Sequence, residues 1–351
     1  MGWYAAVGRP LFFSLPPETA HRVAGAMLGL PLPWSRIGDA VDDPALHMQL
    51  CGVALRSPIG LAAGFDKTCA RLEALGALGF GYTVGGTITR APRAGNAEPR
   101  IARSPATRSM VNAMGLPNPG AEVAAHHLSH LSQHREGDAA RAQAPRFVSL
   151  ADEAAPDAFA SLELVAPHAD GIELNASCPN VSWGRDRDNE SHLRALVSGF
   201  RARTIKPVMV KLPPFITETE REVVLSLARV AQEAGAQAIT CSNTRPVVDT
   251  RLAVGVGGLS GKALWPHTAR IVHQVREATG GEVAVNACGG IFTAEDALTC
   301  LQAGATTVQV YSGLIFQGPT VASTMVRGLA STLRDEGLVL SNLVGTANPA
   351  A

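Results

Sequence analysis

The sequence is poor in aromatic and charged residues, and it lacks the patterns that mark several protein classes. Aromatic residues make up 5% and charged residues 17% of the 351 residues. We therefore expect a core of alanine, valine, leucine and isoleucine. The 30 basic and 30 acidic residues cancel, which disfavours a protein that binds nucleic acid along a basic surface. No run approaches the ~18–20 consecutive apolar residues of a membrane-spanning helix.

The six cysteines show no metal-binding or redox spacing. None belongs to a Cys-X-X-Cys pair, which argues against a zinc ribbon or a thioredoxin-like site. The chain starts without a secretory signal, so we expect a reducing, intracellular location rather than a disulfide framework. Cys69, Cys241, Cys288 and Cys300 fall within expected helices or strands, and we interpret them as packing residues.

Alternating strand and helix patterns begin at residue 58. Short β-branched runs predict strands at 58–64, 81–87, 146–150, 171–177, 207–212, 236–243, 283–289 and 306–312. Helical spacing predicts helices at 69–78, 120–133, 156–167, 189–204, 218–234, 265–279, 294–303 and 320–334. Eight such units in about 275 residues match an α/β protein with a (β/α)8 TIM barrel, usually ~250 residues long. A doubly wound open sheet is the alternative, but it rarely needs eight regular units.

The first 50 residues form a separate, proline-punctuated segment. Apolar residues are dense from Trp3 to Phe13, and from Glu18 to Leu28 they recur at near-helical spacing. We expect residues 1–50 to be a helical extension, residues 51–340 the barrel, and residues 341–351 a flexible tail. The extension either caps the barrel or meets a membrane or a lipophilic ligand.

Polar residues gather where the predicted strands end, which in a barrel is the catalytic face. Lys67, Lys211, Asn112, Asn175 and Asn243 suit a flat heterocycle with alternating carbonyl and N–H groups and a carboxylate. Lys211 stands in an apolar strand, where an unpaired ammonium is costly. It either pairs with a barrel carboxylate or contacts an electron-rich ligand. Carboxylates for Mg²⁺ are missing from this rim, which disfavours phosphoryl transfer.

Glycines follow the last two predicted strands. Gly289-Gly290 and Ser312-Gly313 allow close approach of the backbone, which indicates a phosphate site. One predicted outer helix and its end carry four histidines: His126, His127, His130 and His134. Because they lie on the outside, we predict a solvated face and no metal site.

Cys178 follows the fourth predicted strand in a polar loop, between Ser177 and Pro179. Most buried cysteines are inert packing residues, but this position at the catalytic face favours a functional thiol. A thiol can act as a nucleophile or a general base once its pKa falls from ~8.5. The absence of a histidine at an adjacent strand end argues against papain-like acyl transfer.

Nine short motifs occur in order along the chain. They are LAAGFDK at 61–67, GN at 95–96 with PR at 99–100, NAMGL at 112–116, NASCPN at 175–180, VKLPP at 210–214, SNT at 242–244, GGLSG at 257–261, GGI at 289–291 and YSG at 311–313. With these motifs the chain resembles the dihydroorotate dehydrogenase family, FMN enzymes of pyrimidine biosynthesis. The resemblance runs from about residue 11 to about residue 333.

The resemblance implies a role for each motif. FMN would be held by Ala63, Gly64, Phe65, Asp66, Lys67, Thr87, Asn175, Lys211, Ser242, Gly261, Gly290, Tyr311 and Ser312. Dihydroorotate would be held by Lys67, Asn112, Ala113, Met114, Gly115, Leu116, Asn175, Asn180, Asn243 and Thr244. Cys178 would take the proton from C5 while hydride leaves C6 for flavin N5.

The chain combines features of two classes of the family. Residues 1–50, 257–261 and 311–316 resemble the membrane-associated class, which uses quinone and a serine base. Residues 175–180, with Cys178, and 210–214 resemble the soluble classes, which use a cysteine base. The run at 148–152 lacks the asparagine that the quinone class usually offers to the flavin.

The resemblance implies oxidation of (S)-dihydroorotate to orotate in de novo UMP synthesis, with a quinone reached past Arg103 and Tyr311 beneath residues 1–50. It also implies a cytoplasmic protein that can lie on the cytoplasmic face of the membrane through residues 1–50. A soluble acceptor such as fumarate is one alternative. A related FMN barrel acting on another dihydropyrimidine, or on dihydrouridine in RNA, is a second, and the neutral charge disfavours RNA. A flavin-binding protein without turnover is a third, which the complete polar rim disfavours.

Overall fold

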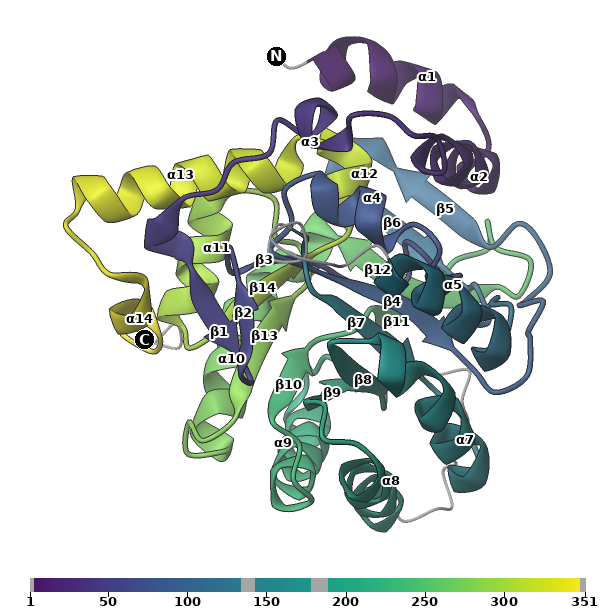
Figure 1. Cartoon of the computed structure of the whole chain (residues 1–351), viewed down its shortest axis with the longest axis vertical. Helices are drawn as coiled ribbons and strands as arrows, with labels where there is room; N and C mark the ends of the chain where they lie inside the picture. The colour runs from purple at the N-terminus through teal and green to yellow at the C-terminus, as the bar shows by residue number, and fades with distance from the viewer. Residues whose placement is uncertain (1–2, 134–142, 178–188, 348–351) are drawn as a thin grey trace.

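The computed structural model describes residues 3–133, 143–177 and 189–347 (Figure 1). Eight parallel strands form a closed barrel in which each strand neighbours the next along the chain and the last pairs with the first. They are β3 (Ile59–Leu61), β4 (Tyr82–Ile88), β7 (Arg146–Leu150), β8 (Gly171–Asn175), β9 (Val208–Leu212), β10 (Ala238–Cys241), β13 (Ala284–Cys288) and β14 (Thr307–Val310). Each overlaps a predicted strand, so the barrel prediction is confirmed.

A helix covers the outside of the barrel after each strand. These helices are α4 (Leu72–Ala77), α5 (Ala121–Gln133), α7 (Ala155–Val165), α8 (Asn189–Arg203), α9 (Glu218–Glu233), α10 (Trp265–Ala278), α11 (Ala294–Gln302) and α13 (Val321–Asp335). Capping boxes start two of them, at Thr217 with Glu220 and at Thr293 with Asp296. Such caps satisfy N–H groups that the first turn of a helix leaves without partners. Short 3-10 turns lie between other elements of the chain: η2 (Pro44–Leu46), η3 (Pro105–Thr107), η4 (Ala166–His168) and η5 (Lys262–Leu264).

The strands bury both faces, as expected for a parallel barrel. On β8 and β9, Ile172 and Val208 belong to the cluster packed beneath the outer helices. Met209, with the other barrel-lining side chains, packs against the antiparallel hairpin β1 (Met48–Leu50) and β2 (Val53–Leu55). The hairpin closes the barrel at the amino ends of the strands, and the expected boundary at residue 50 falls within it.

A four-stranded antiparallel sheet was not predicted from the sequence. Its strands are β5 (Ile101–Ser104), β6 (Ser109–Asn112), β11 (Arg245–Val248) and β12 (Val256–Gly261), in the order β11-β12-β6-β5. All four lie in segments that follow β4 or β10, so the sheet stands at the carboxyl end of the barrel. Gly258 pairs with Asn112 across 146 residues of sequence. Pairing at that separation leaves no local pattern, which explains the omission.

The amino-terminal residues form the helical turns η1 (Tyr4–Gly8), α1 (Arg9–Ser14), α2 (Pro17–Leu28) and α3 (Trp34–Ile37). They lie on the side of the barrel that carries β5 and β6 (Figure 1). The hydroxyl of Tyr4 donates to the carbonyl of Ile315 at 2.9 Å, in α12 (Ser312–Gln317). The guanidinium of Arg100 donates to the carboxylate of Glu18, with a shortest distance of 2.6 Å. None of the described helices is long and apolar enough to span a bilayer.

The carboxyl-terminal residues follow a short helix, α14 (Leu340–Leu343), whose two leucines are buried. The N–H of Ala347 donates to the carbonyl of Gln302 at 2.9 Å, at the end of α11. Residues 341–347, part of the tail that we expected to be flexible, therefore contact the barrel helices. Residues 348–351 lie outside the described part of the chain.

Candidate active site

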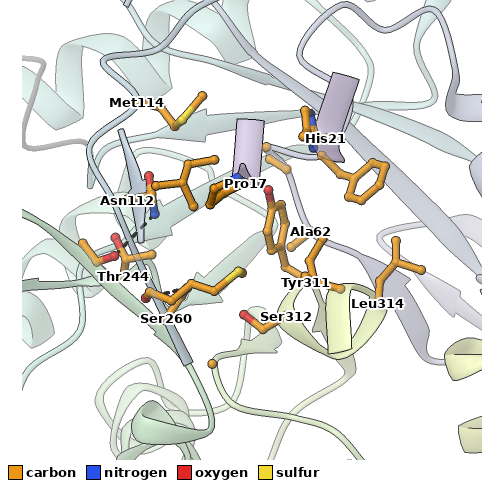
Figure 2. A pocket seen from close by; sticks show the side chains of 18 of the residues that line it. Pro17, His21, Ala62, Asn112, Met114, Thr244, Ser260, Tyr311, Ser312 and Leu314 are labelled. Atoms are coloured by element: carbon orange, nitrogen blue, oxygen red, sulfur yellow. Dashed lines mark hydrogen bonds between the residues drawn. The ribbon is translucent and has the colours of Figure 1, made fainter. Parts of the chain in front are cut away.

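A cavity of about 880 Å³ opens at the carboxyl ends of the barrel strands (Figure 2). Its walls come from the strand ends, the antiparallel sheet and the amino-terminal helices. Figure 2 shows Tyr311 near the centre, with Pro17 and His21 of α2 on one side and Ser312 on the other. The volume suits a ligand of cofactor size together with a smaller molecule.

Thr87 on β4 and Asn175 on β8 line this cavity, and hydrogen bonds with Ser149 on β7 and with Ser177 hold them in place. The amide of Asn175 donates to the hydroxyl of Thr87 at 3.1 Å, and that hydroxyl lies 3.1 Å from the hydroxyl of Ser149. The oxygen of Asn175 accepts from the hydroxyl of Ser177 at 2.8 Å. These bonds hold each polar group in one orientation, so the cavity presents a fixed set of donors and acceptors.

Two lysines face the cavity from different depths. The ammonium of Lys67 donates to the carbonyl of Gly64 at 2.5 Å, and burial lowers the pKa of Lys67 to about 8. Lys211 extends from β9 and is 5% exposed. Burial alone would lower the pKa of Lys211, but neighbouring Cys288 and Glu173 outweigh burial and hold it above its ordinary value. At neutral pH these two lysines therefore bring two positive charges to the cavity.

His21 lies beside Lys67 and remains uncharged at neutral pH. Burial and the nearby Lys67 charge lower the pKa of His21 to about 4. Its ring centroid is 5.1 Å from that of Phe65, which itself meets Tyr311 edge-on at 6.1 Å. The neutral imidazole thus belongs to an aromatic wall beneath α2.

Two glycines bring the backbone close to the cavity. Gly261 has φ +90°, and a Cβ there would lie 2.4 Å from the carbonyl oxygen of Arg108. Gly290 has φ +70°, and a Cβ there would lie 2.6 Å from the backbone nitrogen of Trp265. A larger residue would have to adopt a strained conformation and displace backbone atoms. The narrow spaces at these positions therefore require glycine.

Amide side chains also line the cavity on the side of the antiparallel sheet. The amide of Asn112 on β6 donates to the carbonyl of Gly258 on β12 at 3.4 Å. The amide of Asn243 donates to the hydroxyl of Ser177 at 2.8 Å, and its oxygen accepts from the N–H of Thr244. Asn96 donates to the carbonyl of Ala113 at 2.9 Å and so supports the loop at 112–116. Segments distant in sequence therefore present their polar groups to one space.

The predicted site residues come together with few exceptions. All predicted cofactor residues except Asp66 line the cavity. Asp66 instead shapes the preceding loop, because its carboxylate accepts from the N–H groups of Thr68 and Arg71. The described residues predicted to hold the substrate line the cavity too: Lys67, Asn112, Ala113, Met114, Gly115, Leu116, Asn175, Asn243 and Thr244. The predicted catalytic residue Cys178 and the predicted substrate residue Asn180 lie outside the described residues.

Cys288, which we interpreted as a packing residue, also lines the cavity. It is the last residue of β13, and its side chain faces inward at the point where the barrel opens. Burial raises the pKa of Cys288, so the thiol is neutral at neutral pH. Its inward direction could have been read from the strand alternation that also places Asn286 inside.

Several further lining residues were not predicted, among them His21, Ser260 and Gln309. His21 lies on the buried side of an amphipathic helix, a pattern that also fits ordinary packing. Gln309 could have been found, because an amide in an apolar strand needs polar neighbours. No residue of 148–152 lines the cavity. Asp152 there accepts from the N–H of Arg90 and the hydroxyl of Ser161.

The histidines of α5 lie on the outside of the barrel. The Nε2 atoms of His126 and His130 are 3.2 Å apart, and Nδ1 of His127 lies 2.8 Å from the carbonyl of Thr68. The described part of the chain contains no group of three or more side chains placed to hold a metal. His134 lies outside the described residues.

The amino-terminal side of the cavity is mostly apolar and contains one fixed cation. Arg103 donates to the carbonyls of Phe12 and Leu15. Its guanidinium also stands over the Phe13 ring, 4.5 Å from the centroid. Arg103 and Tyr311 both line the cavity, as expected for a passage beneath residues 1–50.

The fold and the cavity define a (β/α)8-barrel protein with a polar ligand site at the carboxyl ends of its strands and an apolar extension over it. The chain belongs to the dihydroorotate dehydrogenase family, whose sequence model matches residues 45–333. The resemblance drawn from the motifs is therefore confirmed.

Known relatives are similar over nearly their full length. The dihydroorotate dehydrogenase (quinone) of Rhodococcus erythropolis is 34% identical, and the match covers 97% of this chain and 98% of that protein. The dihydroorotate dehydrogenase (quinone) of an Anaeromyxobacter species is 37% identical over 93% of this chain and 92% of that protein. A crystal structure of the Eimeria tenella DHODH in complex with ferulenol has a TM-score of 0.83 and 28% identity. That match covers 94% of this chain and 95% of the Eimeria chain.

Proposed function

We propose that this protein oxidises dihydroorotate to orotate with bound FMN and passes the electrons to a quinone. The observation that carries the proposal is the single cavity that joins two chemically different regions. One region presents amides and ammonium groups, and the other is an apolar passage beneath the amino-terminal helices. A polar substrate and a lipophilic acceptor can therefore reach the same cofactor.

The residues of the cavity fit FMN. Lys211, Asn175 and Thr87 offer a cation, an amide and a hydroxyl to the polar edge of a ring system. Gly261 and Gly290 leave close spaces beside the backbone, which suit a phosphate tail. When bound, FMN accepts hydride from the substrate and delivers the electrons to the acceptor.

The substrate residues fit a flat heterocyclic acid. Asn112, Asn175 and Asn243 can each donate to a carbonyl and accept from a ring N–H. Lys67 adds a positive charge that matches a carboxylate, and it favours dihydroorotate over neutral dihydropyrimidines. Because the site is shielded from solvent, this attraction is stronger than at an exposed surface.

Proton removal from C5 is assigned to Cys178. The residue before it, Ser177, is held by Asn175 and Asn243 through two hydrogen bonds of 2.8 Å. These bonds support the proposal because they tie the residue that precedes Cys178 to the substrate amides. A thiol with a reference pKa near ~8.5 reaches its basic form more readily than a serine hydroxyl.

The acceptor passage is assigned to α1 and α2. Phe13, Ala20, Leu28 and Ile315 give it apolar walls, and Arg103 offers a donor to a quinone carbonyl. Several large apolar side chains of this region are exposed: Trp3, Val7, Leu11, Val23, Met27, Leu30 and Leu32. Exposed apolar surface of this kind suits a peripheral position on a membrane that holds the quinone, at its cytoplasmic face.

Two half-reactions test the proposal separately. Anaerobic dihydroorotate should bleach the visible absorption of the FMN-loaded protein, and a short-chain quinone should restore it faster than fumarate. A protein that keeps its colour with dihydroorotate would contradict the substrate assignment. Faster recovery with fumarate would contradict the acceptor assignment and leave the substrate assignment intact.

A further inference from the structure

A carboxylate is buried inside the barrel, one layer below the cavity. Glu173 on β8 is 0% exposed. Barrel interiors are normally filled by branched apolar side chains, and an enclosed carboxylate is costly unless charge or hydrogen bonds compensate for it. We therefore expect the negative charge of Glu173 to stabilise a neighbouring group.

A chain of hydrogen bonds starts at Glu173 and crosses the barrel. The hydroxyl of Thr240 donates to Oε2 of Glu173 at 3.0 Å, and the amide of Asn286 donates to that hydroxyl at 3.3 Å. The hydroxyl of Thr307 donates to Asn286 at 2.8 Å and lies 2.7 Å from the hydroxyl of Tyr82. Every member of this chain is fully buried.

Oε1 of Glu173 accepts no hydrogen bond within the described residues. Within the described residues, only one carboxylate oxygen, Oε2, accepts a hydrogen bond. Hydrogen bonds therefore compensate only part of the negative charge of Glu173.

Lys211 is the cation next to this carboxylate. On β9, Lys211 is in register with Asn175 of β8 and with Thr240 of β10. Glu173 and Asn175 point into the barrel from alternate positions of β8. The hydrogen bond from Thr240 to Glu173 thus spans β9 close to the base of Lys211. No carboxylate forms an ion pair with Lys211 within 4.0 Å among the described residues, so the attraction acts through space.

We propose that Glu173 is a positioning residue that keeps the Lys211 ammonium charged and directed into the cavity. This inference rests on the proposed function, since it gives the cation its use beside the polar edge of FMN. Glu173 would act through Lys211 and through Thr240, without touching the cofactor itself.

The charges around Lys211 support this role. Burial disfavours the charged form of a lysine and can lower its pKa by several units. Cys288 of β13 and Glu173 of β8 are the groups whose charge acts on Lys211, and together they outweigh burial. Since burial keeps the Cys288 thiol neutral, Glu173 is the anion that remains. Without Glu173, only Cys288 would oppose burial, and its thiol must first ionise to do so.

The test measures FMN binding by the apoprotein, through quenching of FMN fluorescence, at about pH 7 and about pH 10. Lys67 loses its charge over this range in every variant, so the wild type sets the reference change in affinity. Glu173→Gln keeps the shape but removes the charge, so between the lower and the higher pH its affinity should fall roughly tenfold more than that of the wild type, the usual effect of losing one charge-assisted hydrogen bond. Lys211→Met should bind weakly at both pH values, and adding Glu173→Gln to it should change nothing further.

Two more variants complete the test. Thr307→Val removes an equally buried hydroxyl of the same chain without removing a charge, and it should retain the wild-type pH dependence. Glu173→Met replaces the carboxylate by an apolar side chain of similar size. It should shift the pH dependence in the same direction as Glu173→Gln, and it decides the question if Glu173→Gln does not fold. Wild-type pH dependence in whichever of these two variants folds would overturn the inference. Failure of the wild-type apoprotein to bind FMN would instead overturn the proposed function.

Discussion

The charge of Lys67 should control how tightly the enzyme binds its acidic substrate, and raising the pH should remove that charge. Burial lowers the pKa of Lys67 to about 8 in the ligand-free protein. About 90% of this side chain is therefore neutral one pH unit higher, near pH 9. The carboxylate of dihydroorotate then loses its ionic partner inside a shielded cavity.

The size of the effect follows from the lost contact. A hydrogen bond to a charged group contributes ~1.5–3 kcal/mol, which corresponds to roughly 10- to 100-fold in affinity. The bound carboxylate favours the charged lysine, so substrate raises the pKa of Lys67 and the affinity falls only above about pH 8. His21 is already neutral there, because its pKa is about 4.

The assay is the KM for dihydroorotate between about pH 6 and about pH 10, with reduction of bound FMN as the signal. Lys67→Met should show a high KM at every pH, whereas Lys206→Met, which removes a lysine outside the cavity, should follow the wild type. A neutral analogue without the carboxylate should bind with no break near pH 8. A wild-type KM that stays constant through this range would refute the reasoning.

Four further predictions concern the base, the cap and the backbone cradle. Cys178→Ala should retain FMN and orotate but slow FMN reduction by roughly 10²–10⁴-fold, the usual contribution of a general base; a near wild-type rate in stopped flow would place the base elsewhere. Deletion of residues 1–45 should spare reduction by dihydroorotate and abolish reoxidation by a lipophilic quinone, and equal loss of both rates would indicate a general folding defect. Burial tends to raise the pKa of Glu18, but the hydrogen bonds and charge of Arg100 hold it below its ordinary value of 4.5. The stabilisation of the cap by the Glu18–Arg100 pair is therefore present above about pH 4.5 and is lost as the pH falls below it. Limited proteolysis of α2 should increase in acid for the wild type, and already at neutral pH for Glu18→Gln. Unchanged cleavage would contradict this role. Gly290→Ala should lower FMN content, because its Cβ would lie 2.6 Å from the backbone of Trp265. The control Gly280→Ala, at an open position with similar φ, should retain FMN. Full FMN content in Gly290→Ala would argue against a close approach of FMN to the backbone at Gly290.

The barrel and most of the cavity wall could be predicted from the amino-acid sequence. Eight apolar strand runs separated by helical spacing leave few other arrangements, and parallel strands place their carboxyl ends on one face. Residues that follow those ends, such as Lys67, Asn175 and Ser312, therefore meet whatever the details of packing. Their positions at the strand ends were sufficient to predict that they meet, because every βα unit of the barrel has the same orientation.

Which side chains meet between distant βα units could not be predicted and depends on the folded structure. The pairing of β6 with β12 joins Asn112 to Gly258, and neither strand has the length or alternation that would predict the other. The position of Glu173 near Lys211, and its hydrogen bond with Thr240, depend on the stagger between neighbouring strands around the closed barrel. A shift of one residue in that register would turn each side chain to the opposite face, and the register is set by contacts between segments that are far apart in the chain.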